Sequence, residues 1–89
     1  MLSEQDRMMI QDTARRYGVG RVLLFGSSAE HKTLTHDIDI AVEGLAPSRF
    51  FSFYGDLIFG LSKSVDVVDL DRRSKFTDMI RRDGVPLYG

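Results

Sequence analysis

The sequence contains no cysteine, which excludes disulfide bonds, thiolate metal sites and a cysteine nucleophile. It also has almost no excess of charge of either sign, since 12 basic residues stand against 13 acidic ones and leave a net charge of −1. Such a balance argues against binding nucleic acid through a broad phosphate-neutralising surface. No apolar run approaches the length needed to cross a bilayer, and the charged N-terminus does not resemble a secretory signal. We therefore expect a small cytoplasmic protein, and the absence of cysteine fits a reducing compartment.

The chain of 89 residues is long enough for one domain, residues 1–89, with a single modest core. Capping residues, apolar periodicity and glycine or proline breaks predict three helices, three strands and an extended tail. The predicted helices are 4–17, 48–61 and 74–83, the predicted strands are 21–25, 37–42 and 65–70, and the tail is 85–88. This order predicts an α/β (α+β) fold, in which helices pack on a small mixed three-stranded sheet.

Two short stretches carry most of the chemical information. The first predicted strand ends in the small, flexible pair Gly26-Ser27. The second begins Asp37-Ile38-Asp39, and side chains alternate between the two faces of a strand. Asp37 and Asp39 therefore share one face, where they repel each other unless a divalent cation lies between them. The alternative interpretation of this pair is a solvated acidic strand edge.

A third acid is expected at the same place. If the first two strands are antiparallel neighbours, the end of one lies beside the start of the other. The third strand follows a helical crossover, which favours a parallel partner for the second strand. Its early residue Asp66 then falls at the same edge as Asp37 and Asp39, whereas Asp69 points to the opposite face. We expect Asp69 to cap the turn that follows the strand.

The helix predicted at 48–61 has little polar surface. Phenylalanine, tyrosine, leucine and isoleucine fill most of its positions, and a helix that is apolar almost all round needs cover on more than one side. One interpretation is a core helix in a short domain. The other, which we favour, is that the stretch from Phe50 to Leu61 buries part of its surface against a second chain.

The chain resembles the nucleotidyltransferase superfamily typified by DNA polymerase beta, and especially its minimal stand-alone members (MNT). The resemblance rests on LLFGSS at 23–28, HDIDIAV at 36–42, VDVVDL at 65–70 and IRRDGVPLY at 80–88. It implies that Gly26 and Ser27 bind the nucleotide triphosphate. It also implies that Asp37, Asp39 and Asp66 are the catalytic residues and ligate two Mg²⁺ ions.

The resemblance further implies a function. A Mg²⁺-dependent nucleotidyltransferase would move a nucleoside monophosphate, AMP in the expected case, from ATP or another NTP to an acceptor hydroxyl. Minimal members are often encoded beside an all-helical HEPN-type toxin, which implies an antitoxin that modifies this partner. Such a partner, or a second copy of this chain in a homodimer, would cover the helix at 50–61.

One departure from the family pattern keeps a second interpretation open. The segment between Ser27 and Asp37 is one residue shorter than is common, and Glu30 stands where phosphate favours a cation, although Lys32 lies nearby. These features favour a module with the same fold that has lost catalysis. It would neutralise or scaffold a partner protein by contact alone.

Overall fold

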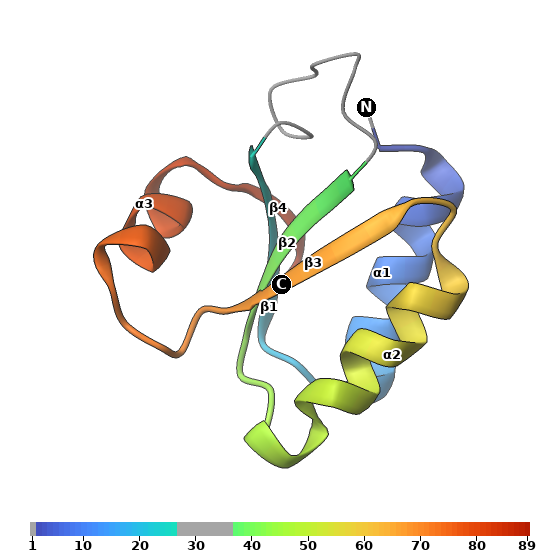
Figure 1. Cartoon of the computed structure of the whole chain (residues 1–89), viewed down its shortest axis with the longest axis horizontal. Helices are drawn as coiled ribbons and strands as arrows, with labels where there is room; N and C mark the ends of the chain where they lie inside the picture. The colour runs from blue at the N-terminus through green and yellow to red at the C-terminus, as the bar shows by residue number, and fades with distance from the viewer. Residues whose placement is uncertain (1, 27–36) are drawn as a thin grey trace.

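The computed structural model describes residues 2–26 and 37–89, and the helices and strands follow the predicted order (Figure 1). Ser3 and Gly18 begin and end the first helix as expected: the Ser3 hydroxyl accepts a hydrogen bond from the Asp6 amide, and Gly18 adopts a left-handed conformation. The elements are α1 (Glu4–Tyr17), β1 (Arg21–Phe25), β2 (Asp37–Glu43), η2 (Pro47–Arg49), α2 (Phe50–Gly60), β3 (Ser64–Asp69), α3 (Lys75–Asp83) and β4 (Val85–Tyr88).

Four strands form one mixed sheet in the order β3-β2-β1-β4, so the prediction of three strands is wrong. β1 pairs antiparallel with β2 and β4, and β2 pairs parallel with β3, as predicted for the first three strands. The extra strand is the expected extended tail, whose Val85 pairs with Leu24. Pairing satisfies the backbone groups along the outer side of β1, which would otherwise lie at an open edge. The segment gives a weak strand signal because it is short and contains Pro86, a residue tolerated in sheets chiefly at edges.

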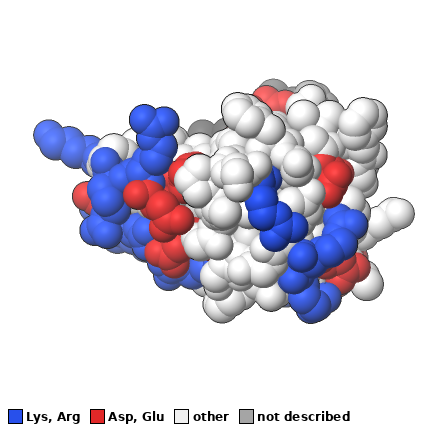
Figure 2. Space-filling view, turned by 90° about the horizontal axis from the view of Figure 1, so that it is seen from below, with Lys and Arg blue, Asp and Glu red and all other residues white. Residues whose placement is uncertain are grey.

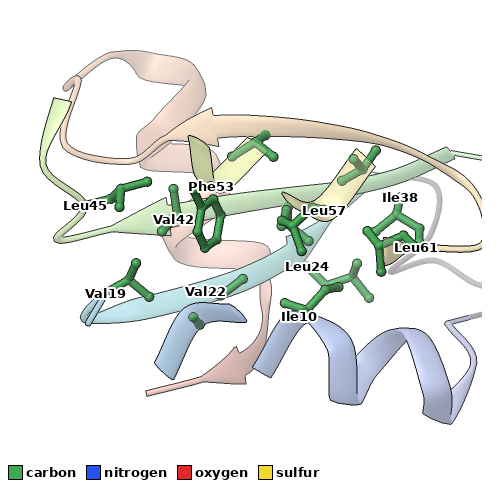
Figure 3. Packing of buried hydrophobic residues seen from close by; sticks show 14 residues of the cluster. Ile10, Val19, Val22, Leu24, Ile38, Val42, Leu45, Phe53, Leu57 and Leu61 are labelled. Carbon is green, nitrogen blue, oxygen red and sulfur yellow. The ribbon is translucent and has the colours of Figure 1, made fainter. Parts of the chain in front are cut away.

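The helices cover both faces of this sheet, with α1 and α2 on one side and α3 on the other (Figure 1). On the first side, Ile10 of α1 and Phe53 and Leu57 of α2 pack against inward side chains of the strands, including Ile38 and Val42 (Figure 3). The predicted alternation is therefore confirmed for β2, whose isoleucines are buried while Asp37 and Asp39 lie on the α3 side. The second, smaller cluster consists of Leu23, Ala41, Leu70 and Ile80.

A buried acid on α1 fixes the connection that leads into β3. The Asp6 carboxylate accepts hydrogen bonds from the Ser62 amide at 3.0 Å and from the Ser62 hydroxyl at 2.5 Å. Both partners compensate for the burial of the charge. The contact ties the loop before β3 to α1, and so it sets where the strand carrying Asp66 begins.

Charges on the surface seen in Figure 2 are mixed, with basic and acidic side chains intermingled around a broad uncharged area. No continuous basic stripe crosses this face. Among the residues that the structure describes, no helix combines the length and the apolar character required to span a membrane.

Candidate active site

Parallel pairing of β2 with β3 places two of the predicted acids directly opposite each other. Asp39 pairs with Asp66, and Asp37 lies two residues earlier on β2, opposite Ser64. Neighbouring strands lie about 4.8 Å apart, and residues two positions apart on a strand share a face. All three acids therefore belong to the same face and the same end of the sheet. Asp39 is half-buried, while Asp37 and Asp66 are exposed.

The carboxylates at this edge influence one another electrostatically. Burial raises the pKa of Asp39 above its ordinary value, and the charges of Asp66 and Asp37 raise it further. A divalent cation would relieve this repulsion, and carboxylate oxygens are ligands that Mg²⁺ prefers, so the donor chemistry fits the predicted ion. Within residues 2–26 and 37–89, however, no three acidic or histidine side chains form a group that could hold a metal ion. Metal ligation by these acids stays a prediction.

Gly26 forms the corner of the site beside these acids. Phe25, the last residue of β1, pairs with Asp39, and Gly26 follows with a positive φ of 72° that favours glycine. A Cβ atom added to Gly26 would lie only 2.6 Å from Oδ2 of Asp39. The Asp39 carboxylate thus lies against the glycine backbone, and only the lack of a side chain permits this approach. The second predicted nucleotide-binding residue, Ser27, lies outside the described residues, as do Glu30 and Lys32.

Tyr54 is a residue of the site that sequence reasoning missed. Its hydroxyl group donates a hydrogen bond to Oδ1 of Asp66 at 3.3 Å, reaching from α2 to the edge strand β3. Burial raises the pKa of Tyr54, so the phenol keeps the proton that it donates. In the sequence Tyr54 is one aromatic residue among many in an apolar helix. The only available signal was its hydroxyl group, because a buried phenol usually finds a polar partner.

Asp69 has the structural role that its position on the strand predicts. Its Oδ1 accepts a hydrogen bond from the Asp71 amide at 2.9 Å, in the turn that follows β3. The Asp71 carboxylate in turn accepts a hydrogen bond from the Gly44 amide at 2.9 Å. Asp69 therefore stabilises the exit of the strand at the end opposite the three acids.

The chain has a nucleotidyltransferase fold. Its mixed sheet has helices on both faces and carries paired aspartates beside a glycine corner. Residues 9–89 match the sequence profile of the family described as Polymerase beta, Nucleotidyltransferase. This match spans nearly the whole chain, and the chain belongs to that family. The resemblance drawn from the sequence motifs is thereby confirmed.

Solved structures of toxin–antitoxin pairs have the same fold. The pair MntA–HepT contains a chain with 25% identity and a TM-score of 0.73, and the match covers 98% of this chain and 73% of that one. A mutant form of the pair, MntA–HpeT, gives 26% identity, a TM-score of 0.75 and coverage of 100% and 74%. A toxin–antitoxin structure with AMP-PNP shares the fold at 24% identity and a TM-score of 0.76, covering 98% and 74%. No curated protein sequence matches the chain. The chain is thus a nucleotidyltransferase-fold domain similar to the MntA antitoxins of such pairs.

Proposed function

We propose that this chain is a Mg²⁺-dependent nucleotidyltransferase that moves AMP from ATP to a hydroxyl group on a partner protein, and that it thereby acts as an antitoxin. The observation that carries the proposal is the register of Asp39 with Asp66 beside Gly26, in a chain that belongs to this family. The similarity to toxin–antitoxin pairs supports a toxin as the partner. The same fold in a toxin–antitoxin structure with AMP-PNP supports an adenine nucleotide as the donor.

Metal binding, phosphate binding and proton transfer are proposed for different residues of the site. Asp37, Asp39 and Asp66 are proposed to hold Mg²⁺, which would stabilise the charge that develops on the phosphoryl oxygens during transfer. Gly26 allows the triphosphate to approach the backbone, and Ser27 is proposed to add its hydroxyl group as a donor. Asp66 is proposed to accept the proton of the acceptor hydroxyl as a general base. As that oxygen bonds to the α-phosphorus, the bond to the leaving pyrophosphate breaks.

The helix α2 supports a partner protein as the acceptor. Phe53 and Leu57 face the core and are fully buried, but Phe51 and Phe59 on the outer side are 83% and 93% exposed. Gly55 lies between them in the sequence, and a Cβ atom added there would meet nothing within 4 Å. A glycine in a helix interior costs about 1 kcal/mol relative to alanine, and no contact with the described part of the chain accounts for it here. We propose that an apolar helix of a HEPN-type partner packs along this side and approaches the backbone most closely at Gly55.

A second candidate function is a catalytically inactive module that neutralises its partner by contact. Glu30 and the short segment between Ser27 and Asp37 favour it, because they weaken the expected support for a triphosphate. In both candidate functions, α2 binds the partner protein. The active enzyme and the inactive module differ only in whether a nucleotide is transferred to that partner.

Transfer of label from ATP to the partner separates the two candidates. The chain would be incubated with ATP labelled at the α-phosphate, with Mg²⁺, and with the protein encoded beside it. Asp39→Asn should abolish labelling of the partner. It should also raise the melting temperature at pH 7, since it removes a carboxylate that is repelled by Asp66 and Asp37. A loss of labelling in a more stable variant cannot be attributed to unfolding.

Asp69→Asn is the matched control for this experiment. The asparagine oxygen can still accept the hydrogen bond from Asp71, and residue 69 points away from the site, so labelling should persist. Neutralisation of the toxin without any label on it would refute the enzymatic proposal and support the inactive module. Equal labelling by the wild type and Asp39→Asn would refute the role of the acids.

A further inference from the structure

A recess of about 470 Å³ lies between the end of β1, the helix α3 and the start of β4. Its walls include Phe25 and Gly26 from the β1 side, Phe76 and Met79 from α3, and Val85 from β4. The volume falls in the range of about 300–1,000 Å³ that is typical of pockets for small ligands. No sequence pattern indicates this recess, because its walls come from three separate segments.

Apolar side chains in this recess lack cover within the described chain. Phe76, Met79 and Val85 are 47%, 43% and 45% exposed, although α3 buries Ile80 fully beside them. Phe25 and Phe76 meet edge to face, with ring centroids 5.8 Å apart. This contact orients the Phe76 ring. An oriented aromatic ring with an exposed surface, next to the polarizable side chain of Met79, suits a flat aromatic ligand.

The recess is continuous with the candidate active site. Gly26 lines it, and the Asp39 carboxylate lies against the backbone of that same glycine. Phe25 pairs with Asp39 in the antiparallel register, so the two side chains occupy the same face of the sheet. A ligand whose phosphates lie at Gly26 therefore has the recess within reach of its remaining part.

We propose that this recess binds the nucleobase of the nucleotide whose phosphates lie at Gly26, with Phe76 as the stacking surface. The inference rests on the proposed function and adds the location of the base. Among the described residues that line the recess, Asp83 alone has an ionisable side chain, and it is already paired with the Arg82 guanidinium through two contacts of 3.1 Å. The recess thus offers stacking and little hydrogen-bonded readout. Purines should bind more tightly than pyrimidines, and ATP and GTP should differ little.

Binding of ATP and of inorganic tripolyphosphate to the full chain, both with Mg²⁺, tests the proposal by calorimetry. Phe76→Ala should weaken ATP binding by about tenfold or more, the usual effect of removing one stacking ring, and leave tripolyphosphate binding unchanged. Phe76→Tyr should restore the affinity for ATP. The matched control is Met8→Ala, which removes an exposed apolar side chain from α1, on the opposite face of the sheet, and should change neither affinity. If Phe76→Ala does not fold, Met79→Ala should show the same selective loss of ATP affinity to a smaller degree.

The possible outcomes distinguish this inference from the proposed function. Equal ATP affinity in the wild type and in folded Phe76→Ala and Met79→Ala variants, with AMP transfer intact, would overturn the base site alone. A parallel loss of ATP and tripolyphosphate binding in Phe76→Ala would also overturn it, because the ring would then support the phosphate corner. Reduced labelling of the partner at unchanged ATP affinity would assign the recess to the acceptor instead. A wild-type chain that binds neither compound would refute the proposed function together with the base site.

Discussion

Substitution of Gly26 by alanine tests whether the glycine corner and Asp39 form one site. Two costs follow from the structure. The positive φ of 72° is unfavourable for alanine by about 1–2 kcal/mol, which in a domain of this size lowers the melting temperature by about 4–16 °C. In addition, the new Cβ would lie 2.6 Å from Oδ2 of Asp39, where ordinary contact begins at 3.4 Å. The carboxylate must therefore withdraw by about 0.8 Å.

This displacement should affect activity far more than stability. The carboxylate is the end of a side chain that can rotate, so the clash adds little to the cost of folding. Metal ligands, however, tolerate errors of only about 0.2 Å, and a misplacement of about 1 Å can cost a hundredfold in rate. We expect Gly26→Ala to reduce the rate of AMP transfer by about a hundredfold and to raise the Mg²⁺ concentration required for half-maximal activity.

Gly18→Ala provides the matched control for this prediction. Gly18 has nearly the same φ, 68°, but a Cβ added there would meet nothing within 4 Å. It should lower the melting temperature by a similar amount and leave the transfer rate unchanged. Both variants would be compared by thermal melts and by labelling of the partner. A Gly26→Ala variant that keeps a transfer rate close to that of Gly18→Ala would refute the assignment of Gly26 and Asp39 to one site.

Three further predictions concern the surroundings of the site and the docking helix. Tyr54→Phe removes the hydroxyl group that hydrogen-bonds to Asp66, so it should raise the Mg²⁺ concentration required for half-maximal AMP transfer. The free energy of unfolding should change by no more than about 1 kcal/mol. An unchanged Mg²⁺ titration would show that the contact has no role in transfer. The pKa of Glu43 lies below its ordinary value of 4.5, because the Arg81 guanidinium donates a hydrogen bond of 2.6 Å to its carboxylate. The ion pair therefore contributes its full stability above pH 4.5, and this contribution is lost as the pH falls through the lowered pKa. Melts of Glu43→Gln should therefore show a loss of about 1 kcal/mol or less at pH 7 that disappears in acid, and a loss that persists at pH 2 would contradict this origin. Gly55→Ala should stabilise the free chain by about 1 kcal/mol yet weaken binding to the partner protein. If the variant pulls down as much partner as the wild type does, the partner does not pack closely against the backbone at Gly55.

Local patterns predicted most of the fold because the forces behind them act over a few residues. Ser3 and Gly18 predicted the ends of α1, since capping depends on the nearest amides and carbonyls. Alternation predicted the two faces of β2, since a strand has a strict period of two. The helix predicted at 48–61 begins instead as a 3₁₀ turn at Pro47–Arg49 and becomes α-helical at Phe50. Helix boundaries are set by competing turn geometries that differ little in energy.

The candidate site was predictable to a similar extent. Facing and topology rules predicted that Asp37, Asp39 and Asp66 share one edge, and the observed register places them there. Whether they bind metal depends on the positions of individual oxygen atoms, which alternation along a strand does not specify. The contact of Tyr54 with Asp66 was not predictable, because it joins a helix to a strand edge through a single hydroxyl group.

The family of this chain, the faces of its strands and the acids at their shared edge are all predictable from the sequence, because each follows from residue type and short spacing. Three features are visible only in the folded chain: Val85–Tyr88 joins β1, α2 leaves Phe51 and Phe59 exposed, and Phe25, Phe76 and Met79 line a recess beside Gly26. These features depend on how distant segments pack, and packing is fixed by the whole set of contacts and not by any one stretch of residues.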